Sequence, residues 1–214
     1  HVRSRRQRQM CIRDSRIATA MVSALKLRSK VVVLGDSGVG KSAVTQMFHS
    51  NGQKFPKNYL MTIGVDFCMK PVPVQVADES RATVELFVFD TAGQDLFAEM
   101  APHYWEGSAS LILVYDITRA ESFHNLAEWL ERISRVVPVE SMVSGCVVAN
   151  KADLRERAEI SREAGEAFAQ RYGFAFFEAS ALEHSGIDAP FAHVAAATHA
   201  RYTDSLAKLT AAVS

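Results

Sequence analysis

A glycine-rich octapeptide, Gly35-Asp36-Ser37-Gly38-Val39-Gly40-Lys41-Ser42, follows a short apolar run near the start of the chain. Two glycines separated by four residues and followed by Lys and Ser form the phosphate-loop pattern. The glycines let the backbone wrap so that successive N–H groups point toward one anion. A helix beginning at Lys41 would add the positive end of its dipole. The octapeptide therefore predicts a phosphate-binding loop between a strand and a helix; the alternative is a tight turn with a capping serine.

On both sides of this loop, apolar runs alternate with segments of helical spacing. Strands are predicted at residues 31–34, 65–76, 84–89, 111–115, 146–149 and 174–177, and helices at 41–49, 121–136, 161–172 and from 190 onward. Such alternation is typical of an α/β sheet covered on both faces. Pro71 and Pro73 predict that one strand lies at a sheet edge or beside a bulge, and residues 77–80 are predicted to form a hairpin turn. We expect a mostly parallel six-stranded sheet with one antiparallel edge strand and helices on both faces.

Composition limits the class of protein. The 214 residues are 48% apolar and 22% charged, which is ordinary for a globular protein and argues against general disorder. No run reaches the roughly 18 apolar residues of a membrane span. Cys11, Cys68 and Cys146 are too few and too scattered for a disulfide framework or a zinc site, which favours a reducing, cytoplasmic compartment.

The first twenty residues differ from the rest. They carry six arginines and one aspartate, a net charge of +5, so the remainder of this neutral chain carries −5. A uniformly basic nucleic-acid binder would not show this distribution of charge, and no nucleic-acid partner is expected. Residues 1–20 are a basic arm, a transit peptide or an extension foreign to the protein, and we favour the last. We expect one domain over residues 21–205 and a C-terminal helix over 190–214.

The phosphate loop assigns several roles. Lys41 can reach the β- and γ-phosphates of a nucleotide, and the Ser42 hydroxyl is placed to hold Mg²⁺. The backbone around the phosphates is expected to comprise Asp36, Ser37, Gly38, Val39, Gly40, Lys41, Ser42 and Ala43.

A second motif, Asp90-Thr91-Ala92-Gly93-Gln94, begins where the strand at 84–89 ends. The Asp90 carboxylate can hold Mg²⁺ directly or through water. Gly93 allows its amide to approach a γ-phosphate because it has no Cβ. Gln94 could orient the attacking water. Alone, an aspartate after a buried strand is more often a cap, so the motif gains its meaning from the phosphate loop.

A third motif, Asn150-Lys151-Ala152-Asp153, follows another buried strand. The Asp153 carboxylate can accept hydrogen bonds from the N1–H and the exocyclic amine of guanine, whereas adenine would leave that charge unpaired. Ser180 and Ala181 follow the last strand and could place a backbone N–H near the guanine carbonyl. Alone, the tetrapeptide could be an Asx turn. With the phosphate loop, it predicts guanine rather than adenine.

Between the first helix and the second strand lie Phe55, Tyr59 and Thr62. Thr62 could complete the Mg²⁺ shell and sense the γ-phosphate, and Phe55 could stack on the base. On residue type alone, Phe55 and Tyr59 would be ordinary loop anchors.

These motifs, in this order, resemble the small GTPases of the Ras superfamily over residues 27–205. The resemblance implies a P-loop GTPase fold, the G domain, that binds GTP and GDP with Mg²⁺ and hydrolyses GTP slowly. It implies that Phe55 stacks on the base, that Tyr59 closes over the phosphates, and that Thr62 and Gln94 are the switch I threonine and switch II glutamine. Lys41, Thr62 and Gln94 form the implied catalytic set. Leu182 stands where the guanine-side motif has a lysine.

Ile63-Gly64-Val65-Asp66-Phe67 has the form seen in Rab proteins. A closer resemblance is to the Rab-like GTPases of intraflagellar transport complex B, on Val72-Pro73-Val74, Leu96-Phe97-Ala98-Glu99-Met100, Trp105 and Asp188-Ala189-Pro190-Phe191. It implies a cilium or flagellum, other complex B subunits, and a small β-sandwich partner, intraflagellar transport protein twenty-five. The alternatives are a subunit that holds GTP as a structural ligand and a Rab GTPase of vesicle traffic. No cysteine follows Cys146, so we expect no prenyl membrane anchor.

The C-terminal helix is expected to serve two purposes. Six apolar residues share one side at helical spacing: Phe191, Val194, Ala195, Tyr202, Leu206 and Leu209. The first three are expected in the core. The last three lie where the domain has little surface left to cover, which predicts a face for a partner; the alternative is that all six belong to the core, which is the usual place of an apolar helix face.

Overall fold

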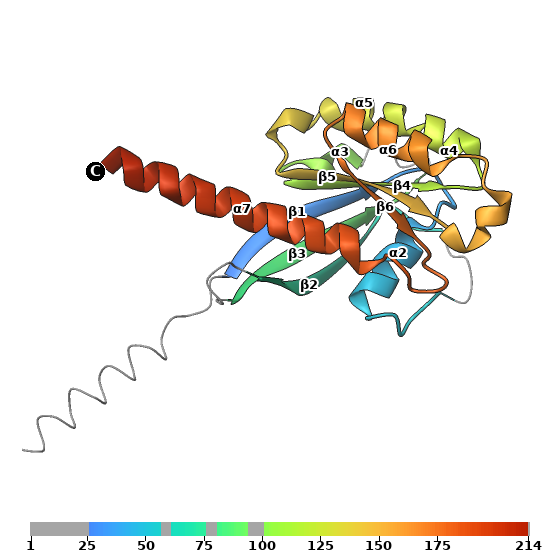
Figure 1. Cartoon of the computed structure of the whole chain (residues 1–214), viewed down its shortest axis with the longest axis horizontal. Helices are drawn as coiled ribbons and strands as arrows, with labels where there is room; N and C mark the ends of the chain where they lie inside the picture. The colour runs from blue at the N-terminus through green and yellow to red at the C-terminus, as the bar shows by residue number, and fades with distance from the viewer. Residues whose placement is uncertain (1–25, 57–60, 76–80, 94–100, 214) are drawn as a thin grey trace, which may run out of the picture.

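The computed structural model describes residues 26–56, 61–75, 81–93 and 101–213. Its centre is a six-stranded sheet in the order β2-β3-β1-β4-β5-β6, in which only the β2–β3 pair is antiparallel (Figure 1). This confirms the predicted sheet. The strands are β1 (Lys26–Leu34), β2 (Val65–Gln75), β3 (Arg81–Thr91), β4 (Ser110–Asp116), β5 (Ser144–Asn150) and β6 (Ala175–Ala179).

Helices cover both faces of the sheet (Figure 1). One apolar cluster joins one face to α2 and α7, and a second joins the other face to α3, α5 and α6. The helices are α2 (Lys41–His49), α3 (Ala101–Trp105), α4 (Ala120–His124), α5 (Leu126–Ser134), α6 (Arg162–Arg171) and α7 (Asp188–Val213), and two short 3₁₀ turns are η2 (Val139–Ser141) and η3 (Ala152–Arg157).

The central strands are buried on both faces, which explains their unbroken apolar runs. Along β1, Val31 and Val33 belong to the cluster under α2 and α7, whereas Val32 and Leu34 belong to the opposite cluster. All four are fully buried. Because helices cover both sides, alternation of polar and apolar residues is absent here. The motifs at the carboxyl ends of the parallel strands are brought to one edge of the sheet.

β2, which contains Pro71 and Pro73, is an edge strand of the sheet, as these prolines predicted. β2 pairs only with β3 among the described strands, so Pro71 and Pro73 remove no hydrogen bond that a second neighbour would need. The predicted hairpin turn at 77–80 lies outside the described residues.

Several element boundaries differ from the sequence prediction, and two of the differences have a clear physical reason. β1 extends back to Lys26, the first described residue, because the largely polar segment before the apolar run still pairs in register with β3. The helix predicted over 121–136 is two helices, α4 and α5. At Asn125 the backbone stays helical, with φ −70° and ψ −11°, and the Trp129 N–H still reaches its carbonyl oxygen. The apolar side chains therefore keep their helical spacing across the boundary between α4 and α5, which is why the sequence predicted a single helix.

α7 is anchored at one end and projects beyond the sheet at the other (Figure 1). Phe191, Val194 and Ala195 are fully buried, as predicted. By contrast, 44% of Leu206 and 64% of Leu209 are exposed. No helix within the described ranges is both long and apolar enough to cross a membrane.

Replacing Phe191 by Ala should destabilise the fold strongly. Its ring stacks on Phe48 with centroids 3.7 Å apart and is fully buried between α7 and α2. We expect Phe191→Ala to lower the free energy of unfolding by about 3–5 kcal/mol, measured by urea denaturation. Leu209→Ala on the projecting half is the control, with a change within about 0.5 kcal/mol. Equal losses in both variants would contradict this packing.

Candidate functional site

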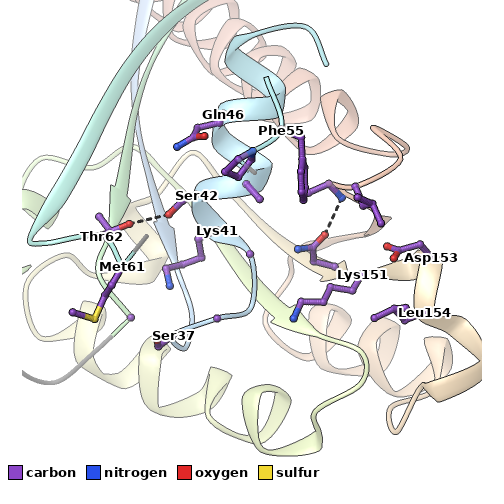
Figure 2. Close-up of a pocket in the computed structure, with 18 residues that line it drawn as sticks. Ser37, Lys41, Ser42, Gln46, Phe55, Met61, Thr62, Lys151, Asp153 and Leu154 are labelled. Atoms are coloured by element: carbon purple, nitrogen blue, oxygen red, sulfur yellow. Dashed lines mark hydrogen bonds between the residues drawn. The ribbon is translucent and has the colours of Figure 1, made fainter. Parts of the chain in front are cut away.

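A cavity of about 750 Å³ lies at the carboxyl edge of the sheet (Figure 2). Loops that follow β1, β5 and β6 and the first turn of α2 form its walls. Parallel strands end together at this edge, which is where ligands bind in such sheets. The residues from the sequence-predicted site that line it are Ser37, Gly38, Gly40, Lys41, Ser42, Ala43, Phe55, Thr62, Gly93, Asn150, Lys151, Asp153, Ala181 and Leu182.

The other predicted residues have different positions. Asp90 lies beneath the cavity, Val39 and Ser180 are buried behind its wall, and Asp36 turns toward α5. Tyr59 and Gln94 lie outside the described residues. Gln46, Pro56, Met61 and Leu154 line the cavity without having been predicted.

The phosphate loop has the conformation that its glycines permit. Gly38 and Gly40 have φ of 78° and 98°, in the left-handed region. Lys41 Nζ donates to the carbonyl oxygens of Gly35 and Asp36, both at 2.8 Å. Burial lowers the pKa of Lys41 to about 8, against the raising effect of the Asp90 and Asp36 charges. The Lys41 ammonium is therefore held across the loop, where the neighbouring carboxylates do not fully compensate its positive charge.

Ser42 and Thr62 lie together at one end of the cavity (Figure 2), and Asp90 contacts Ser42 from beneath it. Ser42 Oγ donates to Asp90 Oδ2 at 2.5 Å and lies 2.9 Å from Thr62 Oγ1. Only 1% of Asp90 is exposed, and burial raises its pKa to about 6, although the Ser42 hydrogen bond and the Lys41 charge lower it. Asp90 Oδ1 is buried without a hydrogen-bond partner among the described residues. An unpaired buried carboxylate oxygen is costly and points to a cation as its missing partner.

At Gly93 the Asp90 motif packs closely against the phosphate loop. A Cβ there would lie 2.5 Å from both the Asp36 carbonyl carbon and the Ser37 nitrogen, and 2.6 Å from Lys41 Nζ. No other residue type fits without moving the phosphate loop. The glycine therefore sets the distance between the Asp90 motif and the phosphate loop.

The Asn150 side chain ties three loops together at the opposite end of the cavity. Its Nδ2 donates to the Val39 carbonyl oxygen at 2.8 Å, and its Oδ1 accepts from the Ala181 N–H at 3.3 Å. A Cβ on Gly40 would lie 2.3 Å from Nδ2, so the loop must have glycine there. The sequence predicted a backbone N–H from this region, and Ala181 is the one that faces Asn150.

Lys151 and Asp153 form the rest of this end. Lys151 has a left-handed backbone, with φ 66°, and its ammonium pairs with Asp116 at 2.5 Å. Burial would raise the pKa of Asp116, but hydrogen bonds from Lys151 and Thr118 outweigh it and hold the pKa below its usual value. Ser180 Oγ donates to Asp153 Oδ1 at 2.5 Å, which fixes that carboxylate at the cavity wall. Figure 2 shows Asp153 at the end opposite Thr62.

Phe55 and Leu182 supply apolar surface to the cavity. About 40% of Phe55 is exposed, and Leu182, at 61%, is more exposed still. Exposed large apolar side chains on a cavity wall are typical of sites that accept a flat ring. Among the described residues, no three His, Cys, Asp or Glu side chains gather as a metal cluster.

One part of the site was missed by the sequence prediction. Asp36 Oδ1 accepts from Trp129 Nε1 at 2.9 Å, and Oδ2 accepts from Asn125 Nδ2 at 2.8 Å. Arg119 Nη2 donates to the Ser37 carbonyl oxygen at 2.9 Å and lies 3.8 Å from Asp36 Oδ2. These partners are more than 80 residues away from the loop in sequence, and no local pattern links them.

Comparison with known proteins agrees with this geometry. The model of the Ras family matches residues 30–200. The chain therefore belongs to the Ras family, whose fold implies binding of a guanine nucleotide.

Within that family, the relatives are Rab-like. The chain is 41% identical to the intraflagellar transport protein 27 homolog of Bos taurus, over 85% of this chain and 96% of the relative. It is 38% identical to intraflagellar transport protein 27 of Chlamydomonas reinhardtii, over 85% and 89%. It is also 36% identical to the Ras-related protein Rab-10 of Caenorhabditis elegans, over 82% and 83%.

Asn150→Ala should destabilise the site and the fold together. The variant leaves the Val39 carbonyl and the Ala181 N–H without their side-chain partner, at about 1–3 kcal/mol for each unsatisfied buried group. Urea denaturation should show this loss, whereas Gln170→Ala on the exposed side of α6 should change the free energy of unfolding by less than about 0.5 kcal/mol. A loss as small as that of the control would show that Asn150 does not hold the loops together.

Proposed function

We propose that the chain binds GTP and GDP with Mg²⁺ and hydrolyses GTP slowly, as a nucleotide-dependent switch. One observation carries the proposal: a phosphate loop and a guanine-type carboxylate, Asp153, lie at opposite ends of one cavity. Membership of the Ras family supports it, since Ras-family small GTPases are generally GTPases. In such a switch, loops that contact the γ-phosphate order in the GTP state and relax after hydrolysis.

The guanine end accounts for base selection. Asp153, held by Ser180, would accept two hydrogen bonds from guanine and would be left unpaired by adenine. Phe55 would stack on the base. The Ala181 N–H, which donates to Asn150 Oδ1 in this structure, would also face the carbonyl oxygen of guanine. Leu182, in place of a lysine, would offer apolar contact beside the base but no charge.

The residues present fit a magnesium ion. Asp90 supplies a buried carboxylate oxygen without a partner among the described residues, and Ser42 and Thr62 supply hydroxyls beside it. Oxygen donors of this kind, completed by phosphate and water, suit Mg²⁺. When bound, the ion would offset the negative charge of the β- and γ-phosphates.

The phosphate end would position the reacting group. Lys41 and the loop N–H groups would bind the phosphate oxygens, and the Gly93 backbone would approach the γ-phosphate. Gln94, which lies outside the described residues, would orient the attacking water, and Tyr59, also outside them, would close over the phosphates. Lys41, Thr62 and Gln94 thus remain the proposed catalytic set.

We further propose that this switch works in intraflagellar transport, in the cytoplasm and the cilium or flagellum. The support is the similarity to relatives named intraflagellar transport protein 27, which covers most of this chain. The proposed domain is residues 21–205, with the distal part of 190–214 docking a partner. That partner is proposed to be the small β-sandwich subunit of complex B, beside other complex B subunits.

Asp153→Asn should exchange base specificity. The asparagine amide can still accept from N1–H, but its NH₂ meets the guanine amine, whereas xanthine presents a carbonyl oxygen at that position. We expect GTP affinity to fall by about 10²-fold or more, and affinity for xanthosine triphosphate to rise, by fluorescence titration. Asp204→Asn, on exposed α7, is the control and should keep the wild-type preference. Wild-type protein that binds ATP as tightly as GTP would overturn the assignment of Asp153.

The projecting half of α7 should be required for the partner and not for the nucleotide. At 100° per residue, Leu206 and Leu209 lie on one side of the helix, and Asp204 and Lys208 lie on the other. We expect the double variant Leu206→Ser/Leu209→Ser to lose co-purification with the β-sandwich subunit while retaining GDP affinity. The double variant Asp204→Ala/Lys208→Ala is the matched control and should retain both. If both double variants still co-purify with the β-sandwich subunit, the interface lies elsewhere.

A further inference from the structure

Arg119 places a guanidinium against the phosphate loop. It lies between β4 and α4, and its Nη2 donates to the Ser37 carbonyl oxygen at 2.9 Å. Its Nη1 lies 3.7 Å from the point that a Cβ on Gly38 would occupy. The contact therefore runs along two consecutive residues of the loop.

Ser37 and Gly38, which Arg119 contacts, line the phosphate end of the cavity, where the γ-phosphate would lie; Arg119 reaches them from outside the cavity wall. The Ser37–Gly38 peptide, whose carbonyl oxygen binds Arg119, follows directly on the Asp36–Ser37 peptide, and a Cβ on Gly93 would lie 2.5 Å from the Ser37 nitrogen of that preceding peptide. Lys41 Nζ is also close, at 2.6 Å from the point that a Cβ on Gly93 would occupy. The Arg119 charge contributes to lowering the pKa of Lys41. The guanine end, at Asp153, lies opposite (Figure 2).

The Arg119 guanidinium is held beside Asp36 and Ser37 but still has N–H groups that can donate to phosphate oxygens. The Asp36 carboxylate next to it already accepts from Trp129 and Asn125, and lies 3.8 Å from Arg119 Nη2. The Arg119 side chain is 39% exposed, and its Nε is buried without a hydrogen-bond partner among the described residues. A guanidinium has five N–H donors in a fixed fork, so donors remain for phosphate oxygens.

We propose that Arg119 is a catalytic arginine supplied by the chain itself, which turns from the Ser37 carbonyl to donate to oxygens of the γ-phosphoryl group during hydrolysis. In that step a water oxygen bonds to the γ-phosphorus and the bond to the β–γ bridging oxygen breaks. The electron pair leaves with GDP, and the products are GDP, inorganic phosphate and a proton. Arg119 transfers no proton; it stabilises the negative charge of the transition state. The inference rests on the proposed GTPase function and deepens it.

Two substitutions separate the charge from the hydrogen bond. Arg119→Gln keeps an N–H donor for the Ser37 carbonyl and removes the cation, whereas Arg119→Lys keeps the cation and loses the fork. Arg135→Gln is the matched control, because Arg135 pairs with exposed Glu131 at the end of α5, away from the cavity. The readouts are GDP affinity, single-turnover GTP hydrolysis, and binding of aluminium fluoride to the GDP complex, which mimics the transition state.

We expect Arg119→Gln to slow hydrolysis by about 10²-fold or more, since an arginine in this role contributes about 10³–10⁵. Arg119→Lys should retain part of the rate, GDP affinity should stay within about threefold in both variants, and Arg135→Gln should match wild type. Wild type alone should bind aluminium fluoride with GDP, and Arg119→Gln should not.

Other outcomes overturn the inference. Hydrolysis and fluoride binding that persist in Arg119→Gln would show that the cation is not used, and equal loss of GDP affinity and hydrolysis would show that Arg119 only supports the loop. In both cases the proposed function stands, because wild type still binds and hydrolyses GTP. A wild-type chain that does not bind GTP, or binds it without hydrolysis, overturns this inference together with the proposed function.

Discussion

The close approach of backbone segments around Lys41 is the constraint on which the site depends. Gly40 packs against the Asn150 amide, and Gly93 packs against the Asp36–Ser37 peptide, at distances that admit no Cβ. The loop between β1 and α2 is thereby clamped between the ends of β3 and β5. Because all three strands belong to one sheet, the rigidity of the core passes directly to the phosphate loop.

This geometry has an electrostatic consequence. Lys41 and Asp90 are both buried, and burial shifts the pKa of each toward the neutral form. Neither charge is fully compensated by the protein, and Asp90 Oδ1 has no hydrogen-bond partner in the described part of the chain. A phosphate anion beside Lys41 and a cation beside Asp90 would supply the missing partners. The site therefore suits a ligand that carries a phosphate anion together with a cation. Binding of such a ligand to the folded protein should raise the free energy of unfolding.

The two ends of the molecule have different physical characters. At the cavity, polar groups are fixed by hydrogen bonds between loops, as for Asn150 with Val39 and Asp153 with Ser180. Along α7, the Phe191 end is fixed by packing, and the Leu209 end leaves apolar surface in water. An apolar helix face that covers nothing in the described part of the chain is a reason to expect a partner.

The sequence by itself determined the sheet, its edge strand and the motifs of the cavity, because each depends on residues close together in the chain. Pro71 and Pro73 identified the edge strand, and glycine spacing identified the phosphate loop. Only the tertiary structure decided that Arg119, Asn125 and Trp129 meet the loop at Asp36, and that Asp90 has an oxygen without a partner. Periodicity shows which face of a helix is buried, but it does not show which loop lies opposite. Contacts across 80 or more residues arise only when the sheet brings its strand ends together.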